Sequence, residues 1–207
     1  MKYLIFILFI FFFFRINAQT LGLKQGDLLF QHLNCGDFCE AIEKVTPSYN
    51  NTHFAHVGIL MKDQKNQWIV AEAVSKGVCL TVLDTFINRS GGKNIYVGRL
   101  NSKYKVPSLK EIEKFIGSPY DSVFDIENNA YYCSELVYFL YKDNAGNKIF
   151  KLNPMKFKDP ETGTFFPAWL QYFQKMNIAI PENKPGINPG SMINQQKLFE
   201  KIFPLEP

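Results

Sequence analysis

Two apolar segments joined by a short polar turn constrain the fold of this chain more than any other feature. Residues 54–61 (FAHVGILM) and 67–74 (QWIVAEAV) are apolar on both faces of an extended strand, as in strands buried inside a sheet. The turn between them, residues 63–66, is too short for a crossover connection. The sequence therefore predicts an antiparallel hairpin at a buried position.

Further elements extend this hairpin into an α+β domain. Apolar runs bounded by turn residues predict three more strands, at 28–31, 77–82 and 94–100. Helical spacing and capping residues, such as Ser108 with Glu111, predict helices at 38–46, 83–89, 108–116, 130–143 and 167–176. An antiparallel sheet with helices clustered after it is typical of the α+β class.

The first 18 residues have the layout of a secretory signal peptide. Lys2 precedes twelve apolar residues, 3–14, and Ile16-Asn17-Ala18 offers a cleavage site before Gln19. The apolar run is shorter than the roughly 20 residues of a transmembrane helix, and an uncleaved anchor is the alternative. We therefore expect a secreted or periplasmic protein with no stable membrane insertion after cleavage.

Length and charge fit one exported domain. The 207 residues are enough for one sizeable core, which we expect to span residues 19–180, with the Pro-rich segment 181–207 as an extended extension packed on it. Removing residues 1–18 removes Lys2 and Arg15, which lowers the formal net charge from +4 to +2. This net charge is small and is spread along the chain, whereas nucleic-acid binding needs clustered basic residues, so we expect no nucleic-acid partner. The proline spacing also prompts the hypothesis that the end of the chain covers a cleft.

One cysteine lies near the expected start of a helix. Cys133, in NNAYYCSELVYF, has a position where unpaired N–H groups and the helix dipole favour a thiolate. A nucleophilic cysteine also needs an imidazole and a group that orients it. The hairpin would place His56 beside Glu72, a carboxylate that needs a partner inside a buried strand. Each of the three also has a structural interpretation, as a core histidine, an edge carboxylate or a packing cysteine.

Two patterns of histidine and cysteine suggest a metal site as an alternative. They are His53-x-x-His56 and His32-x-x-Cys35-x-x-x-Cys39. The first places its two rings on opposite faces of a strand, and the second lacks an obvious fourth ligand. We therefore expect no metal.

The four cysteines allow disulfides in an exported protein. Cys35 and Cys39 are close enough in sequence to pair with each other if the segment is not regular helix, which would leave Cys79 and Cys133 free. The sequence does not determine the connectivity.

Five motifs carry a resemblance to a known family. They are GDLLF (26–30), FAHVGIL (54–60), VAEA (70–73), SPYDSVF (118–124) and YYCSELVY (131–138). In this order they resemble the YiiX/YebB-like group, which are circularly permuted papain-fold hydrolases of the NlpC/P60 superfamily. The resemblance covers about residues 23–143, with weaker similarity through Trp169 and the stretch at 185–189. It implies a permuted papain-like fold in which the histidine strand precedes the cysteine helix.

The same resemblance implies roles for individual residues. Cys133 would be the nucleophile, with its backbone N–H as an oxyanion donor. His56 would be the general base and then the general acid, and Glu72 would orient it. The cleft would be lined by residues to which we assign no chemical step, Tyr120, Asp121, Tyr131 and Tyr132. No cofactor is implied.

The expected function is that of an exported cysteine peptidase or amidase that works through a thioester acyl-enzyme. Cell-wall peptides as its substrate rest on analogy with the superfamily. The same triad could instead cleave a lipid amide or ester, or transfer an acyl group. A peptide- or lipid-binding module without catalysis is the alternative from a different class, and the reactivity of Cys133 would separate the two.

Overall fold

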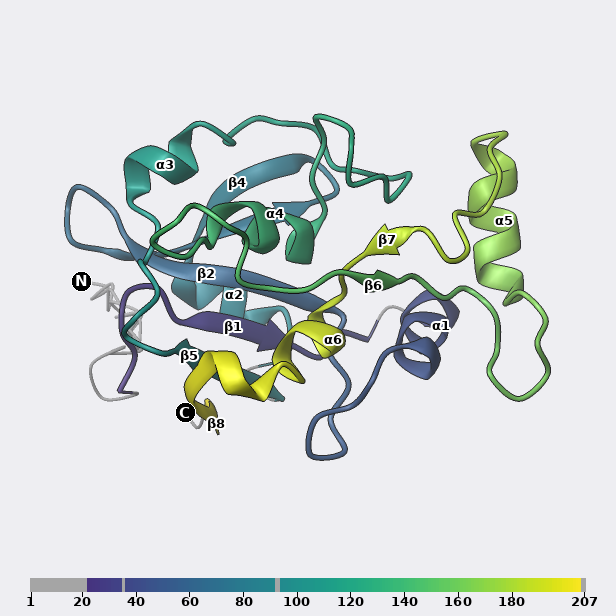
Figure 1. The fold of residues 1–207 in the computed structure, drawn as a ribbon, viewed down its shortest axis with the longest axis horizontal. Helices are drawn as coiled ribbons and strands as arrows, with labels where there is room; N and C mark the ends of the chain where they lie inside the picture. The colour runs from purple at the N-terminus through teal and green to yellow at the C-terminus, as the bar shows by residue number, and fades with distance from the viewer. Residues whose placement is uncertain (1–21, 35, 92–93, 206–207) are drawn as a thin grey trace, which may run out of the picture.

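The computed structural model describes residues 22–34, 36–91 and 94–205. Its centre is a six-stranded sheet in the order β4-β3-β2-β1-β5-β8, in which every neighbouring pair is antiparallel (Figure 1). The predicted signal peptide lies outside the described residues. Within the described ranges, no helix has both the length and the apolar character needed to cross a membrane.

All the strands that the sequence predicts are present, with small shifts of their ends. They are β1 (Leu28–Gln31), β2 (His56–Lys62), β3 (Trp68–Val74), β4 (Gly77–Val82) and β5 (Ile95–Leu100). The hairpin of β2 and β3 lies inside the sheet, between β1 and β4. The continuous apolar character of these two strands follows from that position, since both of their faces are covered.

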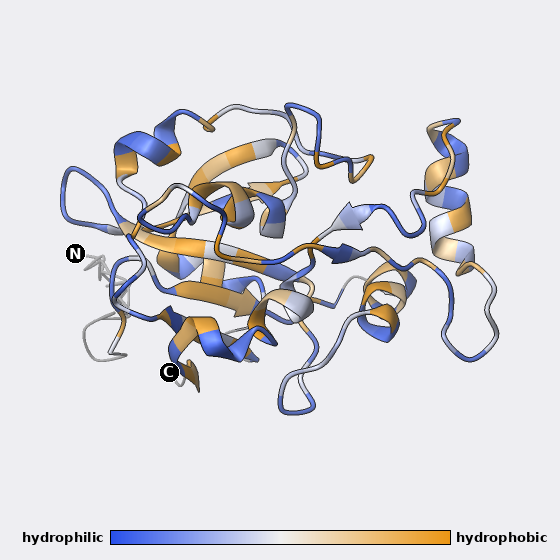
Figure 2. Cartoon of the chain, in the orientation of Figure 1, coloured by the Kyte–Doolittle hydropathy of each residue, from blue (hydrophilic) through white to orange (hydrophobic). Residues whose placement is uncertain are grey.

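Helices cover the two faces of the hairpin. Helix α4 (Cys133–Leu140) packs across β2 and β3 on one face, where Val57 and Ile59 join the main core. Helix α2 (Leu83–Asn88) packs on the opposite face, and Phe86 contributes there to a second core with Val70. Figure 2 shows the central strands and α4 as predominantly hydrophobic.

The start of α4 corrects the sequence prediction of a helix that begins at Ala130. The residues before Cys133 are held in a non-helical conformation, because the side chain of Asn128 accepts the N–H of Ala130 and the N–H of Tyr131 donates to the carbonyl of Pro119. The helix begins at Cys133 instead. This residue therefore has a backbone N–H without an acceptor inside the helix.

Three more helices lie around the sheet. Helix α3 (Leu109–Glu113) begins at the predicted capping box of Ser108 and Glu111. Helices α1 (Asp37–Val45) and α5 (Pro167–Lys175) pack together at one end of the sheet (Figure 1). Their contact contains an aromatic cluster in which the rings of Phe38 and Trp169 are 4.4 Å apart.

The C-terminal segment differs from the extended extension that the sequence predicts. It contains β7 (Pro185–Gly186), which pairs with β6 (Asn153–Pro154), then α6 (Pro189–Ile193), the 3-10 turn η1 (Gln196–Leu198) and β8 (Phe199–Pro204). Strand β8 pairs with β5 and is an edge strand of the main sheet. The prolines made the segment look extended in the sequence. In the structure, Pro189 occupies the first turn of α6 and Pro204 lies at the end of an edge strand, two positions where proline is tolerated.

Candidate active site

The β2–β3 hairpin brings His56 and Glu72 together. Ile59 lies opposite Ala71, and extending this register by one residue places Gly58 opposite Glu72. His56, two residues before Gly58, therefore points to the same face as Glu72 and is its diagonal neighbour. His56 Nε2 lies 2.7 Å from Glu72 Oε2, and the Glu72 side chain is fully buried.

Glu72 has two further partners that the sequence analysis did not identify. Arg89, which follows α2, donates to both carboxylate oxygens, and the hydroxyl of Thr81 in β4 donates to Oε1. Burial alone would raise the pKa of Glu72, but hydrogen bonds from Arg89, His56 and Thr81 lower it to about 2. The carboxylate is therefore ionised at neutral pH and held from three directions.

Cys133 lies at the start of α4, against the first residues of β2. The ladder between β2 and β3 begins after Val57, so the N–H of Val57 is available to the Cys133 sulfur and donates to it. The N–H of Ser134 and the ring of His56 also form hydrogen bonds with this sulfur. Because His56 Nε2 bonds to the carboxylate, Nδ1 is the ring nitrogen that faces the sulfur.

These contacts shift both titrating groups toward an ion pair. Burial would raise the pKa of the Cys133 thiol, but the hydrogen bond and charge of His56, with the N–H groups of Val57 and Ser134, lower it from its ordinary value of 9.0. Burial would lower the pKa of His56, but Cys133 and Glu72 raise it from 6.5 to about 9. The geometry therefore favours a thiolate beside an imidazolium.

The carboxyl group of Glu135, near this thiolate, is shifted toward its neutral form. It is the third residue of α4 and is buried, and one of its oxygens accepts the N–H of Tyr132. Burial raises the pKa of Glu135 to about 8. The first turn of α4 thus keeps the electrostatic conditions that stabilise an anion at its N-terminus.

A cavity of about 100 Å³ opens beside the Cys133 sulfur. Its walls come from α1, the loop before α4, the aromatic cluster and the start of α6. The lining is mostly apolar or aromatic, with members that include Phe38, Ile42, Phe124, Met155, Phe157, Trp169 and Ile187. Among the described residues that line it, Lys156 is the only side chain with a fixed charge.

The structure separates the four residues that the sequence placed along the cleft. Tyr120 and Tyr132 line the cavity, whereas Asp121 and Tyr131 are not among its lining residues. The Asp121 carboxylate instead accepts three backbone N–H groups, of residues 123, 124 and 125, and so shapes the loop behind Tyr120. Tyr131 packs its ring 5.0 Å from that of Phe115. The roles of all the site residues stay predictions.

The C-terminal segment forms one wall of the cavity. Ser134 Oγ donates to the carbonyl of Ile187 at 2.8 Å, and the N–H of Ile187 donates to the hydroxyl of Tyr132 at 3.1 Å. Ile187 and Pro189 line the cavity as a result. No sequence pattern identified a role for Ser134 or Ile187, although the stretch at 185–189 belongs to the weaker part of the family resemblance.

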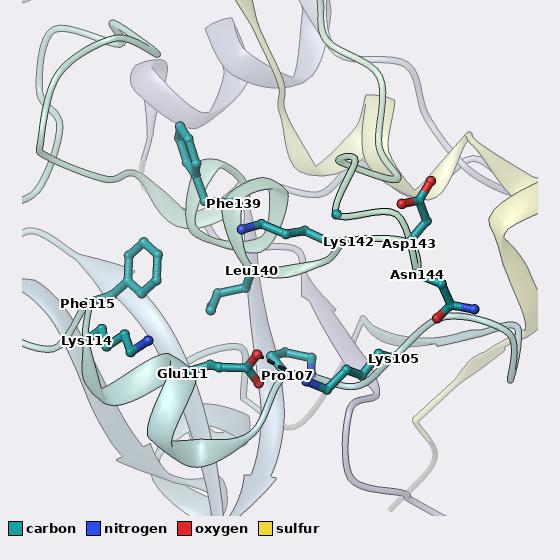
Figure 3. Close-up of a pocket in the computed structure, with 11 residues that line it drawn as sticks. Lys105, Pro107, Glu111, Lys114, Phe115, Phe139, Leu140, Lys142, Asp143 and Asn144 are labelled. Carbon is teal, nitrogen blue, oxygen red and sulfur yellow. Dashed lines mark hydrogen bonds and ion pairs between the residues drawn. The ribbon is translucent and has the colours of Figure 1, made fainter.

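A second, larger cavity lies at the other end of α4. Its volume is about 530 Å³, and Figure 3 shows lysines around an apolar floor that contains Phe115, Phe139 and Leu140. None of the predicted catalytic residues lines it. Of the three predicted catalytic residues, Cys133 lines the smaller cavity, so a substrate would reach the predicted nucleophile there.

The described cysteines differ in their covalent state. Cys79 and Cys133 form no disulfide, whereas Cys39 is disulfide-bonded. Cys35, to which the predicted pairing also refers, lies outside the described residues. In the described part of the chain, no three His, Cys, Asp or Glu side chains cluster so as to hold a metal ion.

Comparison with known proteins identifies relatives. The model of a family of permuted papain-like amidases, YaeF/YiiX, C92, matches residues 22–202. The uncharacterized protein YiiX of Escherichia coli K12 is 28% identical over 138 residues, and the match covers 64% of each chain, so it spans less than two thirds of that relative. A crystal structure of YiiX from Escherichia coli O157:H7, described as a metalloprotein, has a TM-score of 0.67 at 21% identity, covering 88% of this chain and 96% of that chain.

These comparisons agree with the fold and with the predicted resemblance. The likeness to the YiiX crystal structure shows a shared fold, and the α+β architecture with an antiparallel sheet agrees with the permuted papain-like fold that the resemblance implies. Since the family model extends from before β1 into β8, the chain belongs to the C92 family of permuted papain-like amidases of the YaeF/YiiX type.

Proposed function

We propose that this protein is an exported cysteine hydrolase that cleaves amide bonds, with Cys133 as nucleophile. The observation that carries the proposal is the contact of the Cys133 sulfur with a His56 ring whose other nitrogen lies 2.7 Å from the buried Glu72 carboxylate. A cysteine that served only for packing would not need a buried charge network beside it. The family model for permuted amidases supports the reaction class.

The reaction would proceed in two halves. The Cys133 thiolate attacks the amide carbonyl carbon, and the N–H of Cys133 donates to the developing oxyanion. The His56 imidazolium then gives its proton to the leaving nitrogen as the C–N bond breaks, which releases an amine and leaves a thioester. Neutral His56 next takes a proton from water, and the resulting hydroxide attacks the thioester and releases the acid and the thiolate.

The lining of the cavity supports an apolar acyl group as the part of the substrate beside the scissile bond. Aromatic and aliphatic side chains surround Cys133 there, and Lys156 alone offers a fixed charge among the described lining residues. A cell-wall peptide carries several charged groups, so this lining favours a fatty-acyl or other apolar amide. Tyr120 remains a hydroxyl donor to such a substrate, because burial and the charge of Cys133 raise its pKa.

A series of N-acyl p-nitroanilides, from acetyl to decanoyl, tests the proposal against a charged peptide anilide. We expect release of nitroaniline that rises with acyl length until the cavity is filled. We also expect intact-mass detection of an acyl adduct that the Cys133→Ala variant lacks. If a folded wild-type protein binds the decanoyl compound but forms no adduct and releases no product, the binding-module alternative is correct. Faster cleavage of the peptide anilide would refute the apolar substrate.

Export is proposed from residues 1–18 alone. The amino-terminal sequence of the mature protein recovered from the host cell envelope or medium is the direct test. We expect it to begin at Gln19. Recovery of the intact chain from the membrane fraction would support the uncleaved anchor instead.

A further inference from the structure

Besides His56, the Glu72 carboxylate contacts two further side chains, those of Arg89 and Thr81. We propose that Arg89 is a positioning residue of the catalytic machinery, which fixes Glu72 in the orientation that holds the His56 ring against Cys133. The proposal deepens the hydrolase function above and rests on it. It assigns a role to a residue that no sequence motif identified.

The Arg89 guanidinium makes a bidentate contact with the Glu72 carboxylate. Arg89 Nη1 donates to Glu72 Oε2 at 2.7 Å, and Arg89 Nη2 donates to Oε1. Oε2 is also the atom that His56 Nε2 contacts, so one oxygen joins the arginine to the imidazole. Thr81 Oγ1 bonds to Oε1. A bidentate guanidinium fixes the plane of a carboxylate, which a single point charge does not.

The fold holds Arg89 where this contact is possible. Arg89 ends α2, where its N–H donates to the carbonyl of Phe86 and a cation is favoured by the helix dipole. Its guanidinium lies over the Phe86 ring at 5.5 Å, and that same ring is 5.8 Å from the ring of His56. The Arg89 side chain is 31% exposed and Glu72 is fully buried, so the arginine also separates the carboxylate from water.

Two charged groups face Glu72 directly, His56 from β2 and Arg89 from the end of α2. Strand β4 contributes the neutral hydroxyl of Thr81, and Cys133 in α4 acts on Glu72 through the His56 ring. Without Arg89, the carboxylate would lose two hydrogen bonds and its cover, and water would compete for the oxygen that holds His56. The imidazolium would then be less stable, and the Cys133 thiolate would form only at higher pH.

The test is the rate of iodoacetamide alkylation of Cys133 against pH, with the labelled residue identified by mass spectrometry. For Arg89→Met we expect the acidic part of the rate profile to move to higher pH. The rate at pH 6 should fall about tenfold, by analogy with partners that orient metal-ligating side chains. Arg89→Lys should recover part of the rate, since it restores the charge without the fork. Thr81→Val should give a smaller shift in the same direction.

Arg99 provides a matched control. It makes the same kind of bidentate contact with the buried Asp27, at 2.8 and 2.7 Å, away from the cavity. Arg99→Met should lower thermal stability and leave the alkylation profile of the folded protein unchanged.

Each outcome decides between distinct explanations. If Cys133 is reactive in the wild type and the alkylation rate of folded Arg89→Met has the same pH dependence, the positioning role is overturned and the hydrolase proposal stays intact. If the alkylation profile of Arg89→Met moves to lower pH, the positioning role is also overturned, because Arg89 would then act mainly as a positive charge that destabilises the imidazolium. A wild-type Cys133 no more reactive than a model thiol would refute the hydrolase proposal itself.

Discussion

Replacing Glu72 by glutamine should lower the pKa of His56 and weaken the Cys133–His56 ion pair. The substitution keeps the shape of the side chain and removes the negative charge that accepts the Nε2–H of the ring at 2.7 Å. It also leaves the Arg89 guanidinium beside a neutral amide. The change therefore acts on the electrostatics of the site with little change in volume.

The size of the effect follows from the shift in the wild type. The pKa of His56 is raised from 6.5 to about 9 against the opposing effect of burial, with the hydrogen bonds and charges of Cys133 and Glu72 as the causes. Each pKa unit corresponds to about 1.4 kcal/mol, so the net stabilisation of the imidazolium is roughly 3 kcal/mol. Cys133 and Glu72 together raise the pKa by more than this net shift, because they also offset burial. If Glu72 supplies about half of their combined effect, Glu72→Gln should lower the pKa of His56 by at least about 1 unit.

A ¹⁵N NMR titration of the imidazole rings measures this directly, because the chain has only three histidines. Glu43→Gln is the matched control, since Glu43 lies 2.8 Å from Nδ1 of His32 and is not part of the triad. We expect it to leave the titration of His56 unchanged. A folded Glu72→Gln protein in which His56 still titrates near pH 9 would refute the role of the carboxylate.

Three further predictions concern stability. The pKa of Glu72 is about 2, against an ordinary 4.5, so its carboxylate stabilises the fold above pH 4.5 and this contribution is lost as the pH falls toward 2. Urea unfolding across that range should show the difference in unfolding free energy between wild type and Glu72→Gln shrinking by on the order of 3 kcal/mol. A difference that stays constant with pH would contradict this prediction. Gly58→Ala would place a Cβ 2.4 Å from Cγ1 of Val70, so calorimetry should show a loss of about 1–3 kcal/mol, and an unchanged melting temperature would refute this packing. Phe199→Ala should cost about 3–5 kcal/mol in urea unfolding if β8 belongs to the sheet, whereas a cost below about 1 kcal/mol would show that it does not.

The sheet and its hairpin were predictable because their signals are local. Apolar runs and short turns are sufficient to predict β1 to β5, and the hairpin register follows from the turn between β2 and β3. The contact of His56 with Glu72 follows from that register, since diagonal residues on one face of a sheet lie close together. Thr81 could have been found in the same way, as it is two residues beyond Cys79, the partner of Glu72.

Other parts of the site depend on tertiary contacts that have no local signal. Arg89 reaches Glu72 because α2 packs under the sheet, and a charged residue at the end of a short helix looks like an ordinary surface residue. The start of α4 was wrong by a turn because Asn128 and Pro119 hold the preceding residues out of the helix. The helix and strands of the C-terminal segment were missed because proline-rich sequence is typical of extended segments, although the hypothesis that this segment covers a cleft agrees with Ile187 and Pro189 lining the cavity.

The most direct test of the central claim is the pH dependence of Cys133 alkylation in the mature protein, with wild type beside His56→Ala. We expect rapid labelling of Cys133 below pH 7 in the wild type, and loss of this labelling in His56→Ala, because the thiolate depends on the imidazolium. Equally slow labelling of both proteins, or Cys133 found in a disulfide, would contradict the nucleophile and make the binding-module alternative the better explanation.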